Sequence, residues 1–348
     1  MSYQQLIENL FSDTAMSVKF FLPELTLCCT ILLMLLARLF RWGRALGSFV
    51  FATAGAIVAL YYAAPWLLLE SGDMVQRTEL FTGMLVYDSF TVFFRGLLLF
   101  FLILFCVLSQ LTGIPDKEDS GDYYTLVLGS VLGMMLMVSA NHLLIIFLAV
   151  EMASVPSYVL AGMLKGRRKA SEAALKYSIY GAGTAGVMLY GISLVAGITG
   201  SAHLPTVAVR LSELLSGPAM GSAAIVLALG SLMIAVGLAF KLSAVPFHFW
   251  CPDVFEGASA EVNAFLSVAS KAAALALLVR VAIGVGYVPE ATQQRLAQAS
   301  AVAEELAERP AALMDAAPMN AAPMEQAMPP ADALESAAPT AVTEPTAI

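Results

Sequence analysis

The sequence is poor in charged residues. Of its 348 residues, 13% are Asp, Glu, Lys or Arg and 59% are hydrophobic, and the mean hydropathy is +0.80. A soluble domain carries about 25% charged residues. The scarcity of charge therefore excludes an ordinary soluble domain and predicts that most of the chain lies in a lipid bilayer. We expect no nucleic-acid partner.

Residues and motifs that bind metals or cofactors are also scarce. The chain has three histidines and four cysteines, which are Cys28, Cys29, Cys106 and Cys251. It has no CxxC pair, no GxGxxG sequence that follows a strand and no P-loop sequence. We therefore expect no iron–sulfur, haem, zinc or nucleotide site in this chain, and no redox centre. The cysteines are interpreted as small buried hydrophobic residues.

Long apolar segments make up most of the sequence. A bilayer-spanning helix needs about 20 predominantly apolar residues. Eight segments have this character: 20–40, 45–69, 89–111, 122–140, 142–164, 172–198, 222–250 and 260–287. They predict an all-α, polytopic membrane protein with about eight transmembrane helices. The seventh segment is too long for one straight span at about 1.5 Å per residue.

Two short basic loops predict the orientation in the membrane. RLFRWGR (38–44) follows the first segment and KGRRK (165–169) follows the fifth. Both loops fall on one side, which is the cytoplasmic side by the positive-inside rule, so the N-terminus and the C-terminal tail are expected outside. The first residues lack the features of a signal peptide, and we expect the inner (plasma) membrane of a bacterium. The Ala/Pro-rich tail, 289–348, is expected to be disordered.

Two ionisable residues lie deep in predicted spans. Glu151 is near the middle of the fifth segment and Lys271 is near the middle of the eighth. A charge near the bilayer centre costs about 2.5–3.5 kcal/mol on insertion scales, so such a residue is a functional candidate. For both residues a buried structural salt bridge is the alternative.

A third candidate region, FKLSAVPFHFWCPDVFEG (240–257), interrupts the seventh segment. Pro246 has no N–H group for the carbonyl of Leu242, and unpaired backbone groups in lipid are tolerated only against protein or a water-lined cavity. We predict a broken helix with Lys241 at the break, where transporters place ion sites; snorkelling of Lys241 is the alternative. His248 suits a proton relay because histidine titrates near physiological pH, or it is a packed core histidine.

Two further cations are ambiguous. Lys176 follows Glu172 by four residues in the favourable order for a helical ion pair, so a boundary salt bridge and a functional role are both open. Arg95 lies near the outer end of its segment and is expected to snorkel to the interface. Buried acids and lysines without a cofactor favour a protein that moves protons or cations over one that breaks covalent bonds.

Three segments resemble a known family. GLAFKLSAVPFHFWCPDVFEGA (237–258), FLAVEMASVPSYVLAGMLKGRRKASEAALKYSIYGA (147–182) and AFLSVASKAAALALLVRV (264–281) are similar to the antiporter-like subunits of respiratory complex I, the proton-translocating NADH:quinone oxidoreductase. Among these subunits they resemble subunit N. The resemblance covers roughly 140–282.

The resemblance implies a role for each candidate residue. Glu151 and Lys241 match the family's charge pair, and Lys176 matches a lysine that modulates it. His248 matches the family's seventh-helix histidine, and Lys271 matches the eighth-helix lysine of the central hydrophilic axis. The chain would then move protons, coupled to quinone reduction elsewhere. The complex is expected to use NADH, flavin, iron–sulfur clusters and quinone, with none bound by this chain. The other membrane-arm subunits are the expected partners.

The resemblance also implies a domain organisation. Three N-terminal helices would occupy 1–115, and one antiporter-like five-helix repeat with a broken seventh helix would occupy 116–288. Family members carry a second, inverted repeat, which is expected here as a separate chain, as the missing part of a truncated sequence, or as a real loss. A subunit of a multisubunit cation/proton antiporter and a non-conducting structural membrane-arm subunit are the alternatives.

Overall fold

The computed structural model describes residues 3–39, 47–64, 75–114, 119–216 and 220–286, and a few positions between 293 and 301. The chain divides into two units, Met1–Leu296 and Ala297–Ile348. The following account concerns the first unit. The predicted tail, 289–348, lies almost entirely outside the described residues.

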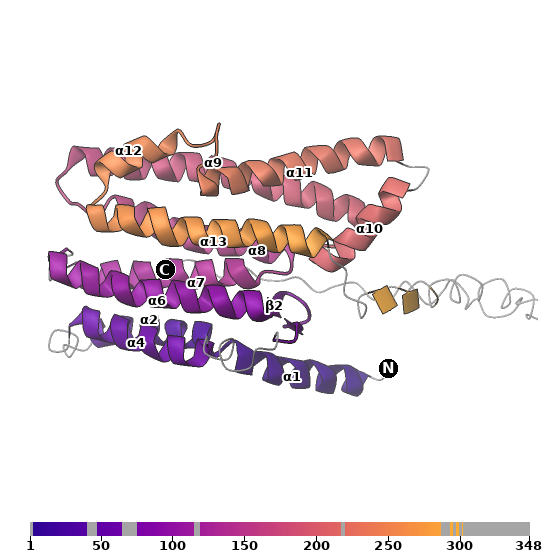
Figure 1. The fold of residues 1–348 in the computed structure, drawn as a ribbon, viewed down its shortest axis with the longest axis horizontal. Coiled ribbons are helices and arrows are strands. Elements are labelled where there is room, and N and C mark those ends of the chain that lie inside the picture. The colour runs from indigo at the N-terminus through magenta and orange to yellow at the C-terminus, as the bar shows by residue number, and fades with distance from the viewer. Residues whose placement is uncertain are drawn as a thin grey trace, which may run out of the picture. The chain divides into compact units, whose positions relative to one another are not determined.

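The first unit consists of helices and one small sheet, and its long helices lie side by side and nearly parallel (Figure 1). The strands β1 (Thr78–Leu80) and β2 (Leu85–Tyr87) form an antiparallel hairpin. The helices are α1 (Tyr3–Phe20), α2 (Leu22–Leu39), α4 (Ser48–Ala63), α6 (Ser89–Thr112), α7 (Ser120–Ser139), α8 (Leu143–Ala161), α9 (Arg168–Thr199), α10 (Leu204–Ser216), α11 (Met220–Leu242), α12 (Trp250–Gly257) and α13 (Ala260–Gly286).

A helix lies at each of the eight segments predicted to span the membrane. Of the described helices, α6, α7, α8, α9, α11 and α13 are long and apolar enough to do so, which makes six. The number rises to seven if α1 and α2, which meet at an angle of 77°, form one bent span. Helix α4 has 16 residues and is shorter. The prediction of an all-helical, polytopic membrane protein is confirmed, with fewer full-length spans than expected.

The seventh predicted span is broken, as expected, but the helix ends before the proline. Helix α11 stops at Leu242, and α12 begins at Trp250 after an irregular segment. The reason is that Pro246 has no N–H group for the Leu242 carbonyl, so a further helical turn would leave that carbonyl without its usual donor. Residues shortly before a proline commonly end a helix for this reason.

The end of α11 is closed by its own backbone. The Ala244 N–H donates to the Ala239 carbonyl at 2.8 Å, and the Ser243 N–H donates to the Phe240 carbonyl at 3.0 Å. This pair of bonds is the Schellman motif. Ser243 occupies the left-handed position of this motif, with a φ of 57°. This conformation is unfavourable for most residues other than glycine. Other contacts must therefore hold Ser243 in place.

Two glycines let pairs of helices pack backbone against backbone. A Cβ atom at Gly133 of α7 would lie 2.4 Å from the Ala153 nitrogen of α8. A Cβ atom at Gly191 of α9 would lie 2.6 Å from the Gly230 carbonyl oxygen of α11. Neither position has room for a side chain, so α7 packs tightly on α8, and α9 on α11.

Two ion pairs at the start of α7 involve a residue from each of the two basic segments. Arg38, at the end of α2, pairs with Asp122 of α7. Lys165, in the loop between α8 and α9, pairs with Asp119 at the start of α7 at 2.6 Å. Arg38 and Lys165, one from each basic segment, therefore lie at the same end of α7.

Arg95 does not snorkel, and that prediction was wrong. Its side chain on α6 is 1% exposed and pairs at 2.6 Å with Glu24 of α2, which is 0% exposed. Arg95 also donates to the Phe20 carbonyl at 3.1 Å, at the bend between α1 and α2. The arginine lies inward because an acid and the Phe20 carbonyl at this bend face it.

A second buried arginine joins α13 to the start of α6. Arg280 is 1% exposed and makes a two-pronged contact with Asp88, at 2.6 and 2.9 Å. It also donates to the Val138 carbonyl at 2.8 Å and to the Thr91 hydroxyl at 2.8 Å. Asp88 in turn caps α6 by accepting from the Thr91 N–H at 2.9 Å. The pair therefore links the beginning of one span to the end of another.

Candidate functional site

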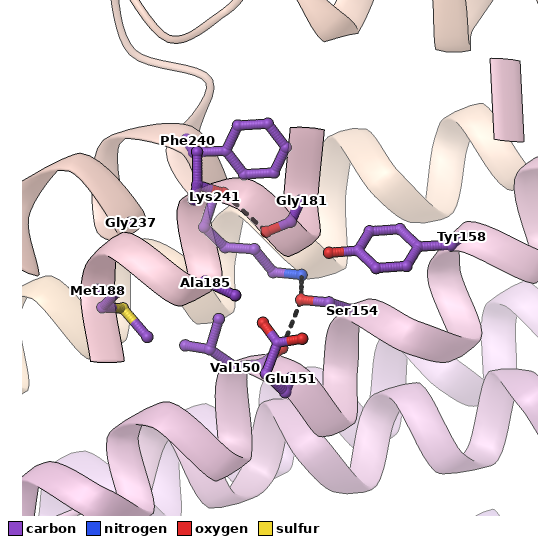
Figure 2. Close-up of a pocket in the computed structure, with 11 residues that line it drawn as sticks. Val150, Glu151, Ser154, Tyr158, Gly181, Ala185, Met188, Gly237, Phe240 and Lys241 are labelled. Atoms are coloured by element: carbon purple, nitrogen blue, oxygen red, sulfur yellow. Dashed lines mark hydrogen bonds between the residues drawn. The ribbon is translucent and has the colours of Figure 1, made fainter. Parts of the chain in front are cut away.

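A small pocket lies between α8, α9 and α11 (Figure 2). Its volume is about 10 Å³, which is the space that one water molecule needs. The pocket is lined by Val150, Glu151, Ser154 and Tyr158 of α8, by Gly181, Thr184, Ala185 and Met188 of α9, and by Gly237, Phe240 and Lys241 of α11. The structure thus places two of the predicted residues, Glu151 and Lys241, in one site.

Lys241 points into this pocket from the last turn of α11. Its side chain is 3% exposed, and its ammonium donates to the Ser154 hydroxyl at 2.9 Å. Ser154 passes the interaction on by donating to the Val150 carbonyl at 2.5 Å. Figure 2 shows this chain of two hydrogen bonds leading from the lysine to the backbone of α8. Lys241 is buried in the fold, so the snorkelling alternative is not supported.

Glu151 faces the same pocket and is half-buried. Among the described residues, no cation lies within 4.0 Å of its carboxylate, so Glu151 and Lys241 share a cavity without direct contact. Opposite charges that line one small cavity attract each other more than they would in water, because the effective dielectric constant inside a protein is lower. The pocket that both side chains line has room for one water molecule.

Tyr158 contributes a further hydroxyl to the pocket. A Cβ atom at Gly181 would lie 2.0 Å from the Tyr158 hydroxyl oxygen, so the glycine on α9 makes room for the phenol. The Tyr158 ring lies edge-on to Tyr177 at 4.6 Å between centroids, and Tyr177 stacks on Trp250 at 4.4 Å. A row of aromatic rings therefore connects the pocket with the start of α12.

Lys271 lies at the helix break, beside this pocket but not in it. Its ammonium donates to the Leu242 carbonyl at 3.1 Å and to the Ser243 hydroxyl. It lies 3.9 Å from the Cys251 sulfur and 5.2 Å from the centre of the Trp250 ring. The structure thus places the Lys271 ammonium next to Leu242, the last residue of α11. Leu242 directly follows Lys241 in that helix.

Lys176 lies outside the pocket, on the surface of α9. Its ammonium pairs with Glu172 at 2.8 Å and with Asp253 of α12 at 2.9 Å, and the side chain is 34% exposed. The predicted pair with Glu172 is present, and the contact with Asp253 adds a second carboxylate. In this conformation Lys176 joins α9 to α12.

His248 is exposed in the irregular segment between α11 and α12. Its carbonyl accepts from the Cys251 N–H at 3.0 Å, and no hydrogen bond of its ring is found among the described residues. A packed core histidine is therefore not observed. The structure does not bring the imidazole to Lys241 or Lys271.

Sequence reasoning missed two hydroxyl groups of the site. Ser154 follows Glu151 by three residues, which places both on one face of a helix, so the spacing could have revealed it. Tyr158 follows Ser154 by four residues and could have been found in the same way. No local pattern indicated Asp253, because its partner Lys176 lies far away in the sequence.

Within the part of the chain that the structure describes, no group of three or more His, Cys, Asp or Glu residues could hold a metal ion. The described cysteines are free thiols. Cys106 is buried, Cys28 and Cys251 are half-buried and Cys29 is exposed. The interpretation of the cysteines as buried hydrophobic residues therefore fits Cys106 and is wrong for Cys29.

Removing the Ser154 hydroxyl is expected to cost about 1.5–3 kcal/mol of folding stability, because a buried ammonium loses its hydrogen-bond acceptor. The free energy of unfolding of Ser154→Ala in detergent micelles measures this cost. Ser157→Ala is the matched control, since Ser157 is one turn further along α8 and its hydrogen bonds to described residues are with neutral groups, the Ala153 carbonyl and the Ser130 hydroxyl. Equal losses in the two variants would contradict the lysine contact.

Comparisons with known proteins identify the family of the chain. The family described as "NADH:quinone oxidoreductase/Mrp antiporter, TM" matches residues 140–303. NADH-quinone oxidoreductase subunit N from Anaeromyxobacter sp. (strain Fw109-5) is 39% identical over 275 residues, covering 78% of this chain and 52% of the relative. The chain belongs to this antiporter-like family of membrane subunits. Its match begins at α8 and includes the pocket and the helix break.

Other members of the antiporter-like family give the same result. Subunit N 2 from Chloroherpeton thalassium is 38% identical over 277 residues, covering 79% of this chain and 52% of the relative. A solved respiratory complex I from Thermus thermophilus with bound aureothin contains a chain that is 31% identical. Its TM-score is 0.59, with 82% of this chain and 58% of that chain covered. The chain thus spans about half the length of the curated relatives it matches.

The fold also occurs in a different assembly. The Mrp complex from Dietzia sp. DQ12-45-1b contains a chain with a TM-score of 0.63 and 18% identity, covering 77% of this chain and 49% of that chain. At this identity the similarity concerns the fold alone.

Proposed function

We propose that this chain is an antiporter-like membrane-arm subunit of a proton-translocating NADH:quinone oxidoreductase. The observation that carries the proposal is the pocket in which Glu151 and Lys241 face each other across a space of about 10 Å³. Similarity to subunit N, at 39% identity over 275 residues, supports the choice of this complex. Under this proposal NADH, flavin, iron–sulfur clusters and quinone belong to other subunits.

In the proposed mechanism Lys241 takes up and releases a proton inside the membrane. The proton affinity of a buried lysine depends on the distance to a neighbouring carboxylate, so movement of Glu151 relative to Lys241 would control this step. The two groups titrate as a coupled pair. Ser154 and Tyr158 supply hydroxyls, and the cavity supplies space for one water, through which the proton could pass.

The proposal assigns Lys271 to the next position of the path, because its ammonium lies at the end of the helix that carries Lys241. Lys176 and His248 enter the proposal through the family resemblance. Lys176 would act through its ion pair with Asp253. His248 would act in the assembled complex, where a neighbouring protein surface could reach its exposed ring.

The exposed helix break supports the proposal that further protein covers this face. Val245 is 80% exposed and Phe249 is 47% exposed, and irregular backbone in a membrane protein needs protein or water around it. The other membrane-arm subunits, and a segment or separate chain that supplies a second repeat, are the proposed partners. The proposed location is the bacterial inner membrane, with the N-terminus outside.

Glu151→Ala and Lys241→Ala are each expected to lower proton pumping several-fold, because each variant removes one half of the coupled pair. The measurement is the number of protons moved per electron in vesicles that contain the assembled complex. Lys165→Ala is the matched control, since Lys165 lies at the surface and pairs with Asp119. Unchanged pumping in both pocket variants would refute their assigned roles.

A subunit of a multisubunit cation/proton antiporter is the second candidate, because the description of the matching family, "NADH:quinone oxidoreductase/Mrp antiporter, TM", includes antiporters. Purification of the intact assembly separates the two candidates. NADH-oxidising subunits that co-purify with this chain support the first, and their absence supports the second. A non-conducting structural subunit would leave pumping unchanged in the pocket variants.

A further inference from the structure

Lys271 makes contacts that a lysine would not need if it only passed protons between two sites. Its ammonium lies between the last residue of α11, the first irregular residue after it, and the first turn of α12. The contacts are the Leu242 carbonyl at 3.1 Å, the Ser243 hydroxyl and the Cys251 sulfur at 3.9 Å. Three acceptors from both sides of the break therefore converge on the three N–H groups of one ammonium.

The Leu242 carbonyl has a specific need for this donor. In a continuous helix it would accept the N–H of the residue four positions later, which is Pro246 and has none. The carbonyls at the C-terminus of a helix also carry a partial negative charge, which a cation stabilises. Lys271 thus supplies both the missing donor and the complementary charge.

The second contact, with the Ser243 hydroxyl, stabilises a residue whose backbone conformation is strained. This residue is not glycine, yet it has a φ of 57°, so its conformation must be held by its surroundings. Its hydroxyl accepts from Lys271 and also from the Cys251 thiol, at 2.9 Å. The ammonium therefore fixes the residue at which the chain changes direction.

A further contact places the ammonium over an aromatic ring that itself bridges the break. The Trp250 ring centre lies 5.2 Å from the Lys271 ammonium, within the range of a cation–π interaction. The Trp250 indole N–H donates to the Phe240 carbonyl at 3.2 Å. Lys271, from α13, contacts both α11 and α12, and Trp250, from α12, contacts α11. Both side chains therefore connect α11 with α12.

We propose that Lys271 is a positioning residue that holds the break between α11 and α12 closed. Its ammonium replaces the amide that Pro246 lacks, fixes Ser243 and ties the end of α11 to α12. We call these contacts of Lys271 with Leu242, Ser243 and α12 the clamp. Because Lys241 occupies the last turn of α11, the clamp also keeps Lys241 in its pocket. The inference goes beyond the proposed proton path, since the clamp acts whether or not Lys271 carries a proton onward.

Cys251 provides a reporter for the state of the break. The full-length chain is expressed in the membranes in which it normally occurs. Serine replaces Cys28, Cys29 and Cys106, so that N-ethylmaleimide labels Cys251. In Lys271→Met we expect labelling to become about tenfold faster, because the charged hydrogen bonds that close the break are lost. Acceleration of labelling therefore reports opening of the break around the Cys251 sulfur.

Two further variants complete the test. Lys271→Arg keeps a cationic donor and is expected to restore slow labelling. Ser243→Ala removes one acceptor and should accelerate labelling less than Lys271→Met, with little added effect in the double variant because both act on one clamp. Labelling at the wild-type rate in both Lys271→Met and Ser243→Ala would overturn the inference, as would equally fast labelling in Lys271→Arg and Lys271→Met.

Proton pumping in the same membranes separates this inference from the proposed function. Faster labelling in Lys271→Met with unchanged pumping supports the clamp and contradicts the assignment of Lys271 to the proton path. Lost pumping with unchanged labelling supports the path and overturns the clamp.

Discussion

Arg95→Leu is expected to destabilise the protein by about 3–5 kcal/mol, because the substitution leaves Glu24 as an unpaired charge in the interior. Arg95 and Glu24 are 1% and 0% exposed and lie 2.6 Å apart, so neither can turn to water. The substitution also removes the donor for the Phe20 carbonyl at the bend between α1 and α2. The free energy of unfolding in detergent micelles measures the loss.

The double variant Glu24→Leu/Arg95→Leu is the control. Replacing both members of a buried ion pair with apolar residues is often neutral or stabilising, so the double variant should be more stable than Arg95→Leu. A double variant as unstable as the single one would show that the two charges do not compensate each other.

Asp88→Asn should have an effect of similar size, about 3 kcal/mol at neutral pH, since Arg280 would remain buried without its carboxylate. Asparagine is as good a helix N-cap as aspartate, so the capping of α6 is preserved and the loss reports the ion pair. The unfolding free energies of wild type and Asp88→Asn give this difference directly. A loss below about 1 kcal/mol, the size expected for an exposed pair, would contradict the buried contact.

The stability lost in Asp88→Asn is also expected to depend on pH. Burial alone would raise the pKa of Asp88, but the Arg280 guanidinium and the Thr91 donors outweigh burial and hold the pKa below its usual value of 3.8. A group with a lowered pKa stabilises the fold above its unfolded-state pKa, and this contribution is lost as the pH falls through the folded-state pKa. The stability difference between wild type and Asp88→Asn should therefore be constant at neutral pH and shrink below about pH 4. A difference that stays constant down to pH 3 would contradict this assignment.

The sequence predicted the long helices well because lipid imposes a simple rule. A span needs a long apolar run, and this requirement can be read locally, as at 89–111, where α6 occupies Ser89–Thr112. The hairpin of β1 and β2 has three residues in each strand, too few for any periodic signal. The amphipathic helix α10 was missed for a related reason, because it contains no long apolar run.

The candidate site was predicted in its charges but not in its contacts. Glu151 and Lys241 could be identified because a charge in an apolar segment is conspicuous wherever it occurs. Which groups surround those charges depends on helices that are distant in the sequence, such as α9 with Gly181 opposite Tyr158. Arg95 illustrates the limit, since its burial depends on Glu24, an acid in another helix.

The glycine contacts described above divide the site between two stiff helix pairs. Gly133 joins α7 to α8, so Glu151 and Ser154 are attached to that pair, whereas Gly191 joins α9 to α11, which carries Lys241. Closely packed backbones leave little freedom for sliding within a pair. The distance between the acid and the lysine is therefore governed by the contact between the pairs, and a force applied to any one of the four helices would alter it by moving two helices at once.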